Sequence, residues 1–298
     1  MNPLYPLYIV SKGRWHENRR LTVRTLEHMR IPYRIVVEEQ EAENYRAAVN
    51  PAFGTVLVLD PAFQRAYETC DDDGLTKPVG SGPARNFAWE HSISLGVARH
   101  WVVDDNIEHF YRLNHNAKLR VLDGTFFYAM ETFVDRYANV AMAGPNYDYF
   151  ANARQRLKPF TINTRLFSCN LIRNDLPMRW RGRYNEDAIL SVDMLKAGWC
   201  TIQFYAFLQG KAPTQSVKGG NTDAFYALEG TLNKSKMLVR THPDVARLMW
   251  RFGRWHHYID FSQFKRNVLV KRPDVVTTPG VDEFGMALVR VGGDSAAD

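Results

Sequence analysis

The sequence predicts an α/β domain in which a mixed, mainly parallel central sheet is flanked by helices. Short apolar runs alternate with helical patterns over the first ~110 residues, and this alternation is typical of βαβ units. The apolar runs in that half end in polar or charged residues. Because ligands of open parallel sheets bind at the carboxyl ends of the strands, we expect a ligand site there.

The individual elements follow from the same patterns. In the first half, apolar runs predict strands at 7–10, 33–40, 54–60 and 99–106, and helical patterns lie at 21–29 and 84–95. In the second half, strands are predicted at 139–150, 165–175 and 200–208, and helices at 125–137, 185–199 and 233–250. The helix at 185–199 has a clear apolar face, and Gly198 is suited to end it.

The length and composition favour one large domain. The chain has 298 residues, of which 45% are hydrophobic, and this is enough for a substantial core. We expect a single domain at 1–272, made of two halves at 1–116 and 117–230 and a basic helical segment at 231–272. The tail at 273–298 is expected to be weakly ordered.

Basic residues are concentrated in two segments, although the net charge of the chain is only +6. Segment 151–183 contains eight Arg or Lys residues and one acid, and segment 231–272 contains ten Arg or Lys residues and two acids. Aromatic residues such as Trp180, Trp250 and Trp255 are interleaved with these charges. The combination favours a polyanionic partner over a generic solvated surface in which Arg stems cover apolar groups.

Nothing in the sequence indicates a membrane protein. No stretch reaches the roughly 18 apolar residues that a membrane span needs, and the N-terminus lacks a basic leader followed by an apolar run. Cys70, Cys169 and Cys200 are odd in number and have no metal-like spacing, which fits a reducing compartment. We expect a cytoplasmic protein with no membrane partner, and no protein partner is implied.

The segment VVDDN brings two carboxylates and an amide to the end of the strand predicted at 99–106. Asp104, Asp105 and Asn106 offer the hard oxygen ligands that Mg²⁺ or Mn²⁺ prefers when it is bound together with a diphosphate. The alternative is structural, because Asp105 or Asn106 could cap a helix that begins at Ile107. Two adjacent acids exceed what capping needs, so metal and nucleotide contact is favoured.

The segment RYNEDAILS places Glu186 and Asp187 in the first turn of a predicted helix, where the helix dipole favours negative charge. Arg179, Arg181 and Arg183 precede them, so we expect a carboxylate here to stay ionised at neutral pH. An ionised, positioned carboxylate can deprotonate an acceptor hydroxyl. Catalytic and structural interpretations are equally supported by this motif alone.

Three further motifs carry weaker signals. In VKGGNT, Lys218 and Asn221 flank two glycines, a flexible cationic backbone suited to phosphate. In SGPARN, Arg85 and Asn86 lie at a helix start, where they serve an anion or a cap equally well. In RWHHYID, His257 is a candidate metal ligand, although a surface or core histidine is at least as common.

Taken in chain order, the motifs resemble those of one family. The resemblance is carried by the segments YIVSKGRW, PYRIVVEEQE, ARNFAWEHSISLG, HWVVDDNI, NTRLFSCNLIRND, RWRGRYNEDAILS, LKAGWCT and KGGNTD. From about Pro6 to about Asn267 the chain resembles the TET-associated glycosyltransferases of bacteriophages and related genomes. Because members resemble GT-A glycosyltransferases, a GT-A-like fold is implied, with a nucleotide-sugar half at 1–116 and an acceptor half at 117–230.

The resemblance also implies an activity and its participants. The implied reaction moves a sugar from a UDP-sugar to the hydroxymethyl group of 5-hydroxymethylcytosine in DNA. The expected donor is thus a UDP-sugar, the expected cofactor a divalent metal (Mn²⁺ or Mg²⁺), and the expected partner hydroxymethylated DNA.

The resemblance assigns roles to residues as well. Asp187 is the expected acceptor base, with Glu186 as its neighbour. The expected metal ligands are Asp104, Asp105, Asn106 and His257. Donor contacts are expected from Ser11, Lys12, Arg14, Glu38, Arg85, Asn86, Asp104, Lys218 and Asn221.

Three alternatives stay open. A GT-A glycosyltransferase with a protein or glycan acceptor explains the acids but gives the basic segments no use. A metal-dependent nuclease that uses Asp104, Asp105 and Glu186 explains acids and charge but not a strand-end pocket. The third is a DNA-binding module without catalytic activity.

Overall fold

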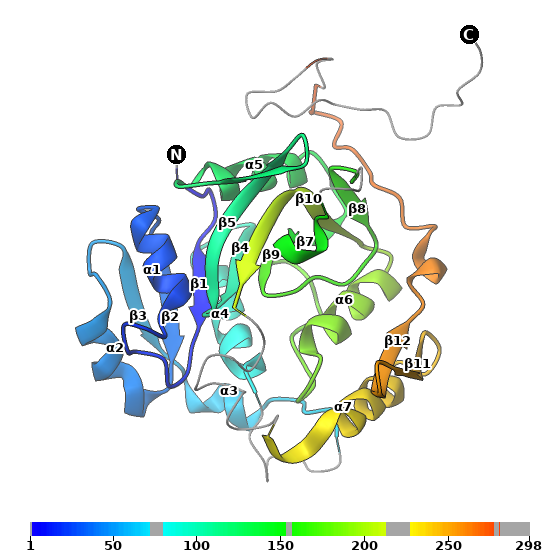
Figure 1. Ribbon diagram of the computed structural model, residues 1–298, viewed down its shortest axis with the longest axis horizontal. Helices are drawn as coiled ribbons and strands as arrows, with labels where there is room; N and C mark the ends of the chain where they lie inside the picture. Colours follow the sequence, from blue (N-terminus) through cyan, green and yellow to red (C-terminus); the bar gives the residue numbers. More distant parts are fainter. Residues whose placement is uncertain (1, 72–79, 153–156, 213–226, 277–279, 281–298) are drawn as a thin grey trace.

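The computed structural model describes the chain except for residues 1, 72–79, 153–156, 213–226, 277–279 and 281–298. The described residues form a mixed α/β structure with helices on both faces of one large sheet (Figure 1), which confirms the predicted class and is consistent with a GT-A-like fold. The strands of this sheet are β1 (Leu7–Val10), β2 (Tyr33–Val37), β3 (Gly54–Val58), β4 (Arg99–Asp104), β5 (Ile107–Asn114), β6 (Ala117–Arg120), β7 (Val140–Tyr147), β8 (Phe160–Ile162), β9 (Cys169–Arg173) and β10 (Cys200–Lys211).

The 10-stranded sheet has the order β3-β2-β1-β4-β9-β7-β10-β5-β6, and β8 also pairs with β10. β3, β2, β1 and β4 are parallel, as are β7 and β10. β9 lies antiparallel between β4 and β7, and β5 and β8 run antiparallel to β10. The carboxyl ends of β1, β2 and β4 therefore meet at one edge, where the residues after each strand can share a site.

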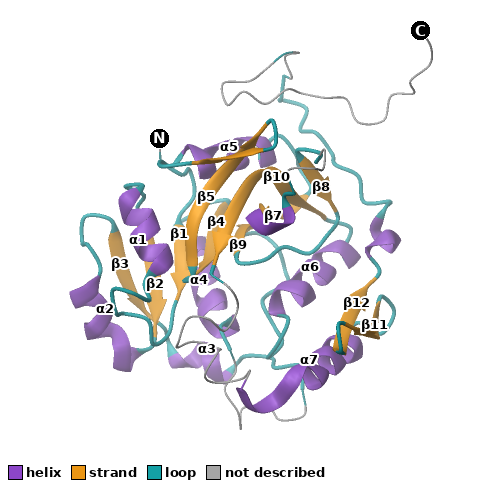
Figure 2. Ribbon diagram, in the orientation of Figure 1, coloured by secondary structure: helices purple, strands orange, loops and turns teal. Residues whose placement is uncertain are grey.

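Two apolar layers cover the two faces of the sheet. Along β1, Leu7 and Ile9 point into one layer while Tyr8 and Val10 point into the other. This alternation is expected of a strand that is buried on both sides. One layer is completed by α1 (Leu21–His28), α2 (Ala42–Ala48) and α5 (Thr125–Val134), and the other by α3 (Pro61–Arg65), α4 (Gly82–Ser94) and α6 (Glu186–Lys196). Figure 2 shows this layered arrangement of helices and strands.

A third apolar cluster joins the C-terminal elements to α6. It consists of residues of α6, of α7 (Ala227–Thr241), of the two-stranded hairpin β11 (Ala246–Arg251) and β12 (Arg254–Ile259), and of the short 3-10 helix η4 (Phe261–Phe264). Two other 3-10 helices lie at η1 (Glu39–Glu41) and η2 (Asp148–Phe150).

The helix predicted at 233–250 is wrong beyond Thr241, and the basic segment is thus only partly helical. Pro243 stands two residues after Thr241, the last residue of α7, and a proline both lacks an N–H for the helix and disfavours helical backbone in the residue before it, here His242. The chain then turns into β11 and β12 instead of continuing the helix. Most of the tail predicted at 273–298 lies outside the described residues.

No helix in the described ranges is long and apolar enough to cross a membrane.

Candidate functional site

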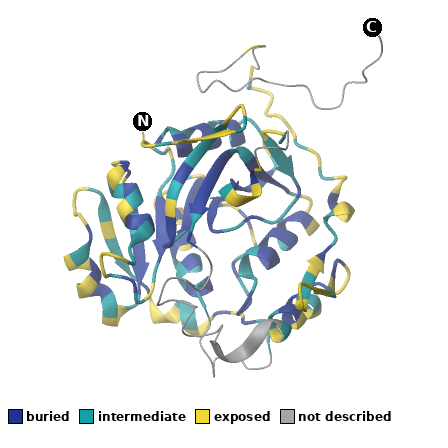
Figure 3. Ribbon diagram, in the orientation of Figure 1, coloured by how far each residue is buried: buried dark blue, intermediate teal, exposed yellow. Residues whose placement is uncertain are grey.

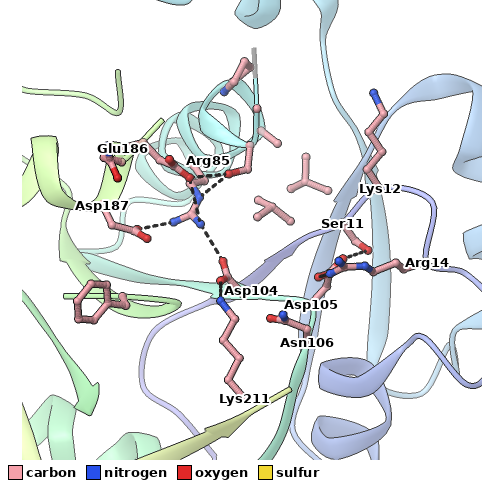
Figure 4. A pocket seen from close by; sticks show the side chains of 18 of the residues that line it. Ser11, Lys12, Arg14, Arg85, Asp104, Asp105, Asn106, Glu186, Asp187 and Lys211 are labelled. Atoms are coloured by element: carbon pink, nitrogen blue, oxygen red, sulfur yellow. Dashed lines mark hydrogen bonds and ion pairs between the residues drawn. The ribbon is translucent and has the colours of Figure 1, made fainter. Parts of the chain in front are cut away.

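A pocket of about 380 Å³ opens at the carboxyl ends of β1, β2 and β4, and its volume is typical of a small-molecule site. It gathers residues that the sequence predicted separately (Figure 4). The predicted site residues that line it are Ser11, Lys12, Arg14, Glu38, Arg85, Asp104, Asp105, Asn106, Glu186, Asp187 and His257. Lys218 and Asn221 lie outside the described residues, so their predicted donor contacts stay predictions.

Two helix starts bring charged residues to the pocket. Pro83 stands near the start of α4, a favourable position for proline, and Arg85 follows in the first turn. α6 begins at Glu186, directly after Asn185, whose φ of 55° lies in the left-handed region that asparagine tolerates. Glu186 and Asp187 thus occupy the first turn of α6, as predicted, where the helix dipole stabilises negative charge.

Arg85 is the centre of the charged cluster. Its guanidinium donates to Asp104 Oδ1 at 2.8 Å and to Asp187 Oδ1 at 3.0 Å, and it lies 3.8 Å from Glu186 (Figure 4). The guanidinium carbon also lies 4.5 Å from the centroid of the Trp180 ring. Only 3% of the arginine is exposed, so the surrounding carboxylates and ring hold it in one orientation.

Asp104 lies between two cations. Lys211 Nζ, at the end of β10, donates to Asp104 Oδ2 at 2.7 Å and to Ser168 Oγ at 2.8 Å. Burial opposes ionisation of Asp104, but Lys211 and Arg85 outweigh it and lower the pKa of this carboxyl. Burial likewise disfavours the Lys211 ammonium, and Asp104 more than compensates, so the pKa of Lys211 is raised. Both groups are therefore charged at neutral pH.

Asp187 behaves differently from Asp104. Burial is the main cause that raises its pKa to about 7, Glu186 and Asp104 add to the shift, and Arg85 and Lys211 oppose it. Its Oδ1 accepts from Arg85 and, at 3.4 Å, from Asn170 Nδ2. Asp187 is thus a carboxylate that exchanges its proton near neutral pH, as a general base requires.

The arginines expected to keep Asp187 ionised do not contact it, so that expectation was wrong. They pair with acids elsewhere, in the ion pairs Arg179–Glu90, Arg181–Asp193 and Arg183–Asp71. The cation beside Asp187 is Arg85, which comes from a helix about a hundred residues earlier in the chain. Burial and the neighbouring carboxylates outweigh that single cation.

Asp105 points away from Asp104, toward the loop that follows β1. It accepts a hydrogen bond from Ser11 Oγ at 2.6 Å and forms an ion pair with Arg14. Tyr45 supports this loop, because its hydroxyl lies 2.7 Å from Ser11 Oγ and accepts from the backbone N–H of Arg14. Asp105 therefore holds the loop after β1, whose residues Ser11 and Arg14 line the pocket.

The helix-cap interpretation of VVDDN is contradicted by the structure. Ile107 begins strand β5, and Asp105 and Asn106 form the turn between β4 and β5. The acids at this strand end consequently do not serve to start a helix.

The strand end of β2 contributes the outer part of the pocket. Lys12 Nζ lies 2.6 Å from Glu38 Oε1, and Gln64 Nε2 donates to the same oxygen at 3.3 Å. Apolar residues, among them Val10 and Val36, line the same pocket. A pocket that combines apolar lining residues with hydrogen-bonding groups suits a heterocyclic base.

The four predicted metal ligands do not converge on one point. Both carboxylate oxygens of Asp104 already face cations, Asp105 is turned to the β1 loop, and His257 Nε2 lies 3.2 Å from the Arg165 guanidinium. Among the described residues, no group of three or more His, Cys, Asp or Glu side chains is placed to hold a metal ion. The donor set in this arrangement does not fit a divalent cation, and we assign no step to one.

Asn86, which was predicted as a donor contact, instead holds the backbone of Trp180. Its side-chain amide donates to the carbonyl of Trp180 and accepts from the N–H of the same residue, both at 2.9 Å. It does not line the pocket. By holding the Trp180 backbone it helps to place the ring that lies against Arg85.

Sequence reasoning missed three cations that line the pocket, namely Arg165, Lys211 and Lys234. Lys211 ends a strand that was predicted to stop at 208, so the rule that polar strand ends form the site could have found it had the strand been extended. Arg165 precedes β9 in an irregular stretch, packs 4.8 Å from the Phe167 ring centroid, and gave no pattern of its own.

This arrangement suits transfer of a group away from an anionic donor. Strand ends that can hold a heterocycle adjoin fixed cations that can offset charge on a leaving group. Asp187 lies in the same pocket as a base for an incoming hydroxyl.

Comparison with known proteins agrees with this chemistry. A family model described as TET-Associated Glycosyltransferase matches residues 5–220, which is more than half of the chain. No match was found among curated proteins. The chain belongs to the TET-associated glycosyltransferase family, and it is a glycosyltransferase.

Proposed function

We propose that this enzyme transfers a sugar from a UDP-sugar to the hydroxyl group of 5-hydroxymethylcytosine in DNA. The observation that carries the proposal is that one pocket joins the strand ends suited to a nucleotide, the cation Lys211 and the titratable carboxylate Asp187. Membership of the family supports a modified base as the acceptor.

The donor nucleotide is assigned to the part of the pocket formed by the first two strand ends. Its uracil ring would lie in the part of the pocket lined by Val10 and Val36, near Glu38 and Lys12. The ribose would approach Ser11, whose hydroxyl is held by Asp105. This placement directs the diphosphate toward Asp104 and the cluster around Arg85.

Cationic side chains are assigned to the diphosphate. Lys211 is charged at neutral pH because Asp104 raises its pKa. Arg165 lines the same pocket and makes no ion pair with an acid in the described part of the chain. Both would stabilise the negative charge that develops on the departing UDP, the kind of electrostatic contribution that often dominates a rate enhancement.

Asp187 is assigned as the base. Arg85 and Asn170 hold its Oδ1, while its Oδ2 has no hydrogen-bond partner among the described residues. In the proposed step Asp187 takes the proton of the acceptor hydroxyl, and the hydroxyl oxygen forms a bond to the anomeric carbon of the sugar. The bond from that carbon to the diphosphate breaks, and UDP leaves with the bonding electron pair.

The nuclease alternative is less well supported by the geometry. Its required acids are Asp104, Asp105 and Glu186, which do not form a metal-binding group among the described residues. Arg85 and Lys211 pair with Asp104, and Arg14 pairs with Asp105, so these carboxylates are already neutralised by protein cations.

The proposal is tested with the full chain and a duplex oligonucleotide that carries 5-hydroxymethylcytosine at one position. The duplex is incubated with individual UDP-sugars, and the nucleosides are then analysed by mass spectrometry. We expect one UDP-sugar to add a single sugar to the modified base, and an unmodified duplex to gain nothing.

Asp187→Asn provides the matched variant for this experiment. Loss of a general base lowers a rate by roughly 10²- to 10⁴-fold, so transfer should fall by that amount while UDP binding persists. Strand breaks without sugar addition would support the nuclease. Release of free sugar with no gain of mass on any DNA would refute the proposed acceptor.

A further inference from the structure

The last two strands form a hairpin with an aromatic tip. Within the described residues β11 and β12 pair with each other and not with the large sheet, and Phe252 and Gly253 form the turn. Both turn residues have left-handed backbone, with φ of 51° and 71°, a conformation that favours small residues such as Asn and Gly. Phe252 is 91% exposed, so burial within this chain does not explain its presence. Apart from a contact with the His256 ring, whose centroid lies 6.2 Å from its own, the Phe252 ring is open to a partner outside the chain.

One face of the hairpin extends from the pocket toward the hairpin tip. Because side chains alternate along strands, the cross-strand pairs Trp250–Trp255 and Leu248–His257 lie on the same face. His257 lines the pocket, and Trp255 stands two residues away along β12, at about 7 Å. The two indole rings are 5.3 Å apart in T-shaped contact and are 58% and 40% exposed. They form an aromatic surface just beyond the pocket.

The opposite face of the hairpin is basic. It carries the pair Arg251–Arg254 beside the tip and the pair Arg247–Tyr258 nearer the base. No acidic residue occurs from 245 to 259. In the described part of the chain, Arg251 and Arg254 form no ion pair with an acid, and Arg254 Nε donates a hydrogen bond to His256 Nε2 at 3.2 Å. Figure 3 shows the hairpin with many exposed residues. Their charges are thus available to phosphate groups.

The combination of features favours DNA as the occupant. A base buried in a duplex must leave the stack to enter an enzyme pocket, and this leaves a gap in the helix. Phe252 lies in the turn just beyond Arg254, and Arg254 is three residues, about 10 Å, from His257 along β12. A duplex that delivers a base to the pocket would lie at this tip. Aromatic rings stack on any base, and arginines neutralise the phosphates around the gap. The hairpin also lies beyond the residues matched by the family model, which end at 220.

We propose that the hairpin inserts Phe252 into the duplex at the position vacated by the target base, an inference that rests on the function proposed above. Trp250 and Trp255 stack against the bases that border the pocket. Arg251 and Arg254 contact the phosphates beside the gap.

Insertion is tested by the fluorescence of 2-aminopurine placed next to 5-hydroxymethylcytosine in a duplex, without donor. Unstacking of the probe should raise its fluorescence when the unaltered enzyme binds, and Phe252→Ala should abolish this rise. Leu119→Ala is the matched control, because Leu119 is 50% exposed on β6 at the edge of the sheet. The control should behave like the unaltered enzyme.

Transfer provides a second readout that separates insertion from a general loss of activity. Stacking of one ring is worth roughly 5- to 100-fold, so Phe252→Ala should lower kcat/KM for the duplex by that factor. A single-stranded oligonucleotide with the same modified base leaves no gap to fill, and its kcat/KM should change little. Equal losses on both substrates would overturn the inference.

The salt dependence of duplex binding tests the arginines. Each phosphate contact contributes about 0.9 to the slope of log affinity against log salt concentration, so Arg251→Ala and Arg254→Ala should each reduce the slope by about that amount. Lys118→Ala on β6 serves as the charge-matched control and should leave the slope unchanged. Unchanged slopes in both arginine variants would remove the phosphate contacts from the proposal.

Failure of this inference can be told apart from failure of the proposed function. If the enzyme glycosylates the duplex and Phe252→Ala matches it in both readouts, insertion is overturned and the function stands. If no DNA is glycosylated but the fluorescence rise depends on Phe252, insertion stands and the function falls. Binding to phosphatidylglycerol vesicles that depends on Phe252, with no binding to duplex DNA, would overturn the inference in favour of a membrane surface.

Discussion

At the scale of single residues, the pocket contains two aspartates whose pKa values are shifted in opposite directions. Lys211 and Arg85 keep Asp104 ionised, whereas burial and nearby acids bring the pKa of Asp187 to about 7. A permanently charged carboxylate suits the orientation of cations, and a carboxylate that titrates near neutrality suits proton transfer. The division of roles follows from the position of each residue relative to Lys211.

The pH dependence of transfer should report Asp187. A base works when ionised, so kcat is expected to fall as pH drops through about 7, the pKa to which burial raises Asp187. Because Arg85 opposes that rise, Arg85→Lys, which loses the forked contact, should move the midpoint to higher pH. A kcat profile that is flat from pH 6 to 8 in the unaltered enzyme would exclude Asp187 as the titrating base.

Lys211 should be needed for the chemical step. Removal of one preorganised charge-stabilising group costs about 10²- to 10³-fold in kcat, so Lys211→Ala is expected to lose activity by this amount. Lys211→Arg should recover part of it, because the charge is kept. Lys236→Ala, an exposed lysine of α7, is the matched control and should retain full kcat in the same transfer assay.

Removal of divalent metal should have little effect on transfer. The carboxylates predicted to bind a metal are paired with Lys211, Arg85 and Arg14, which already supply positive charge to the pocket. We expect the enzyme to remain active after treatment with excess EDTA and dialysis, measured with the hydroxymethylated duplex. Loss of activity that Mn²⁺ or Mg²⁺ restores would show that these carboxylates exchange protein cations for a metal.

At the scale of elements, α5 anchors the start of the chain through one buried acid. Glu131 accepts hydrogen bonds from the N–H of Leu4 at 2.7 Å, the N–H of Tyr5 at 3.2 Å and the indole N–H of Trp101 at 2.7 Å. Burial raises the pKa of Glu131 to about 7 despite these donors. The contacts hold the segment before β1 against β4 and so support the strands that carry the pocket.

Loss of this anchor should destabilise the fold. Glu131→Ala leaves three donors without their acceptor, and each buried unsatisfied group costs about 1–3 kcal/mol. Because two of the donors lie near the surface, we expect the free energy of unfolding to fall by about 3 kcal/mol. Urea unfolding measures this change, and Glu39→Ala, an exposed glutamate, should stay within about 0.5 kcal/mol of the unaltered chain.

The elements differ in how well the sequence predicts them. The strands β1, β2 and β4 and the helix α6 were predicted well, because alternation or helical spacing of apolar residues is a local signal. Most of β11 was predicted as the end of a helix at 233–250, and no strand was predicted at β12, since the turn at Phe252 lacks the Asn-Gly pattern that marks such turns. Both strands of this hairpin are also largely exposed, and only Ala246 and Ile259 at its base are buried, so the sequence shows no alternation of apolar and polar residues along them.

The candidate site was predicted as a set of residues more successfully than as a set of contacts. Strand-end acids and the first turn of α6 are visible in sequence, and they do line one pocket. The partners of those acids are not visible, because Lys211 lies 107 residues after Asp104 and is brought there by the pairing of β10 with β7 and β5. Contacts of this kind depend on the register of distant strands, which no local pattern specifies.

At the scale of the whole molecule, the pocket lies where two parts of the sheet meet. β1, β2 and β4 supply the proposed nucleotide contacts from the first part of the chain, while α6 and β10 supply Asp187 and Lys211 from the second. β9 joins the parts by pairing with β4 on one side and β7 on the other. The proposed donor site and α6, which carries the base, are therefore both held by one continuous sheet, which fixes their separation.

The hairpin of β11 and β12 is not part of the large sheet that fixes this separation. It closes on itself at its base, where the N–H of Asp260 donates to the carbonyl of Val245 at 2.8 Å, and it adds no strand to the large sheet. Its base packs against α6 and His257 lines the pocket, but the tip beyond Trp250 and Trp255 does neither. Changes at the tip can therefore alter the nucleic-acid contacts of the enzyme while the distances around Asp187 stay the same. A chain built in this way can acquire a preference for a new nucleic-acid context through substitutions at a few exposed positions, with its bond-forming centre left intact.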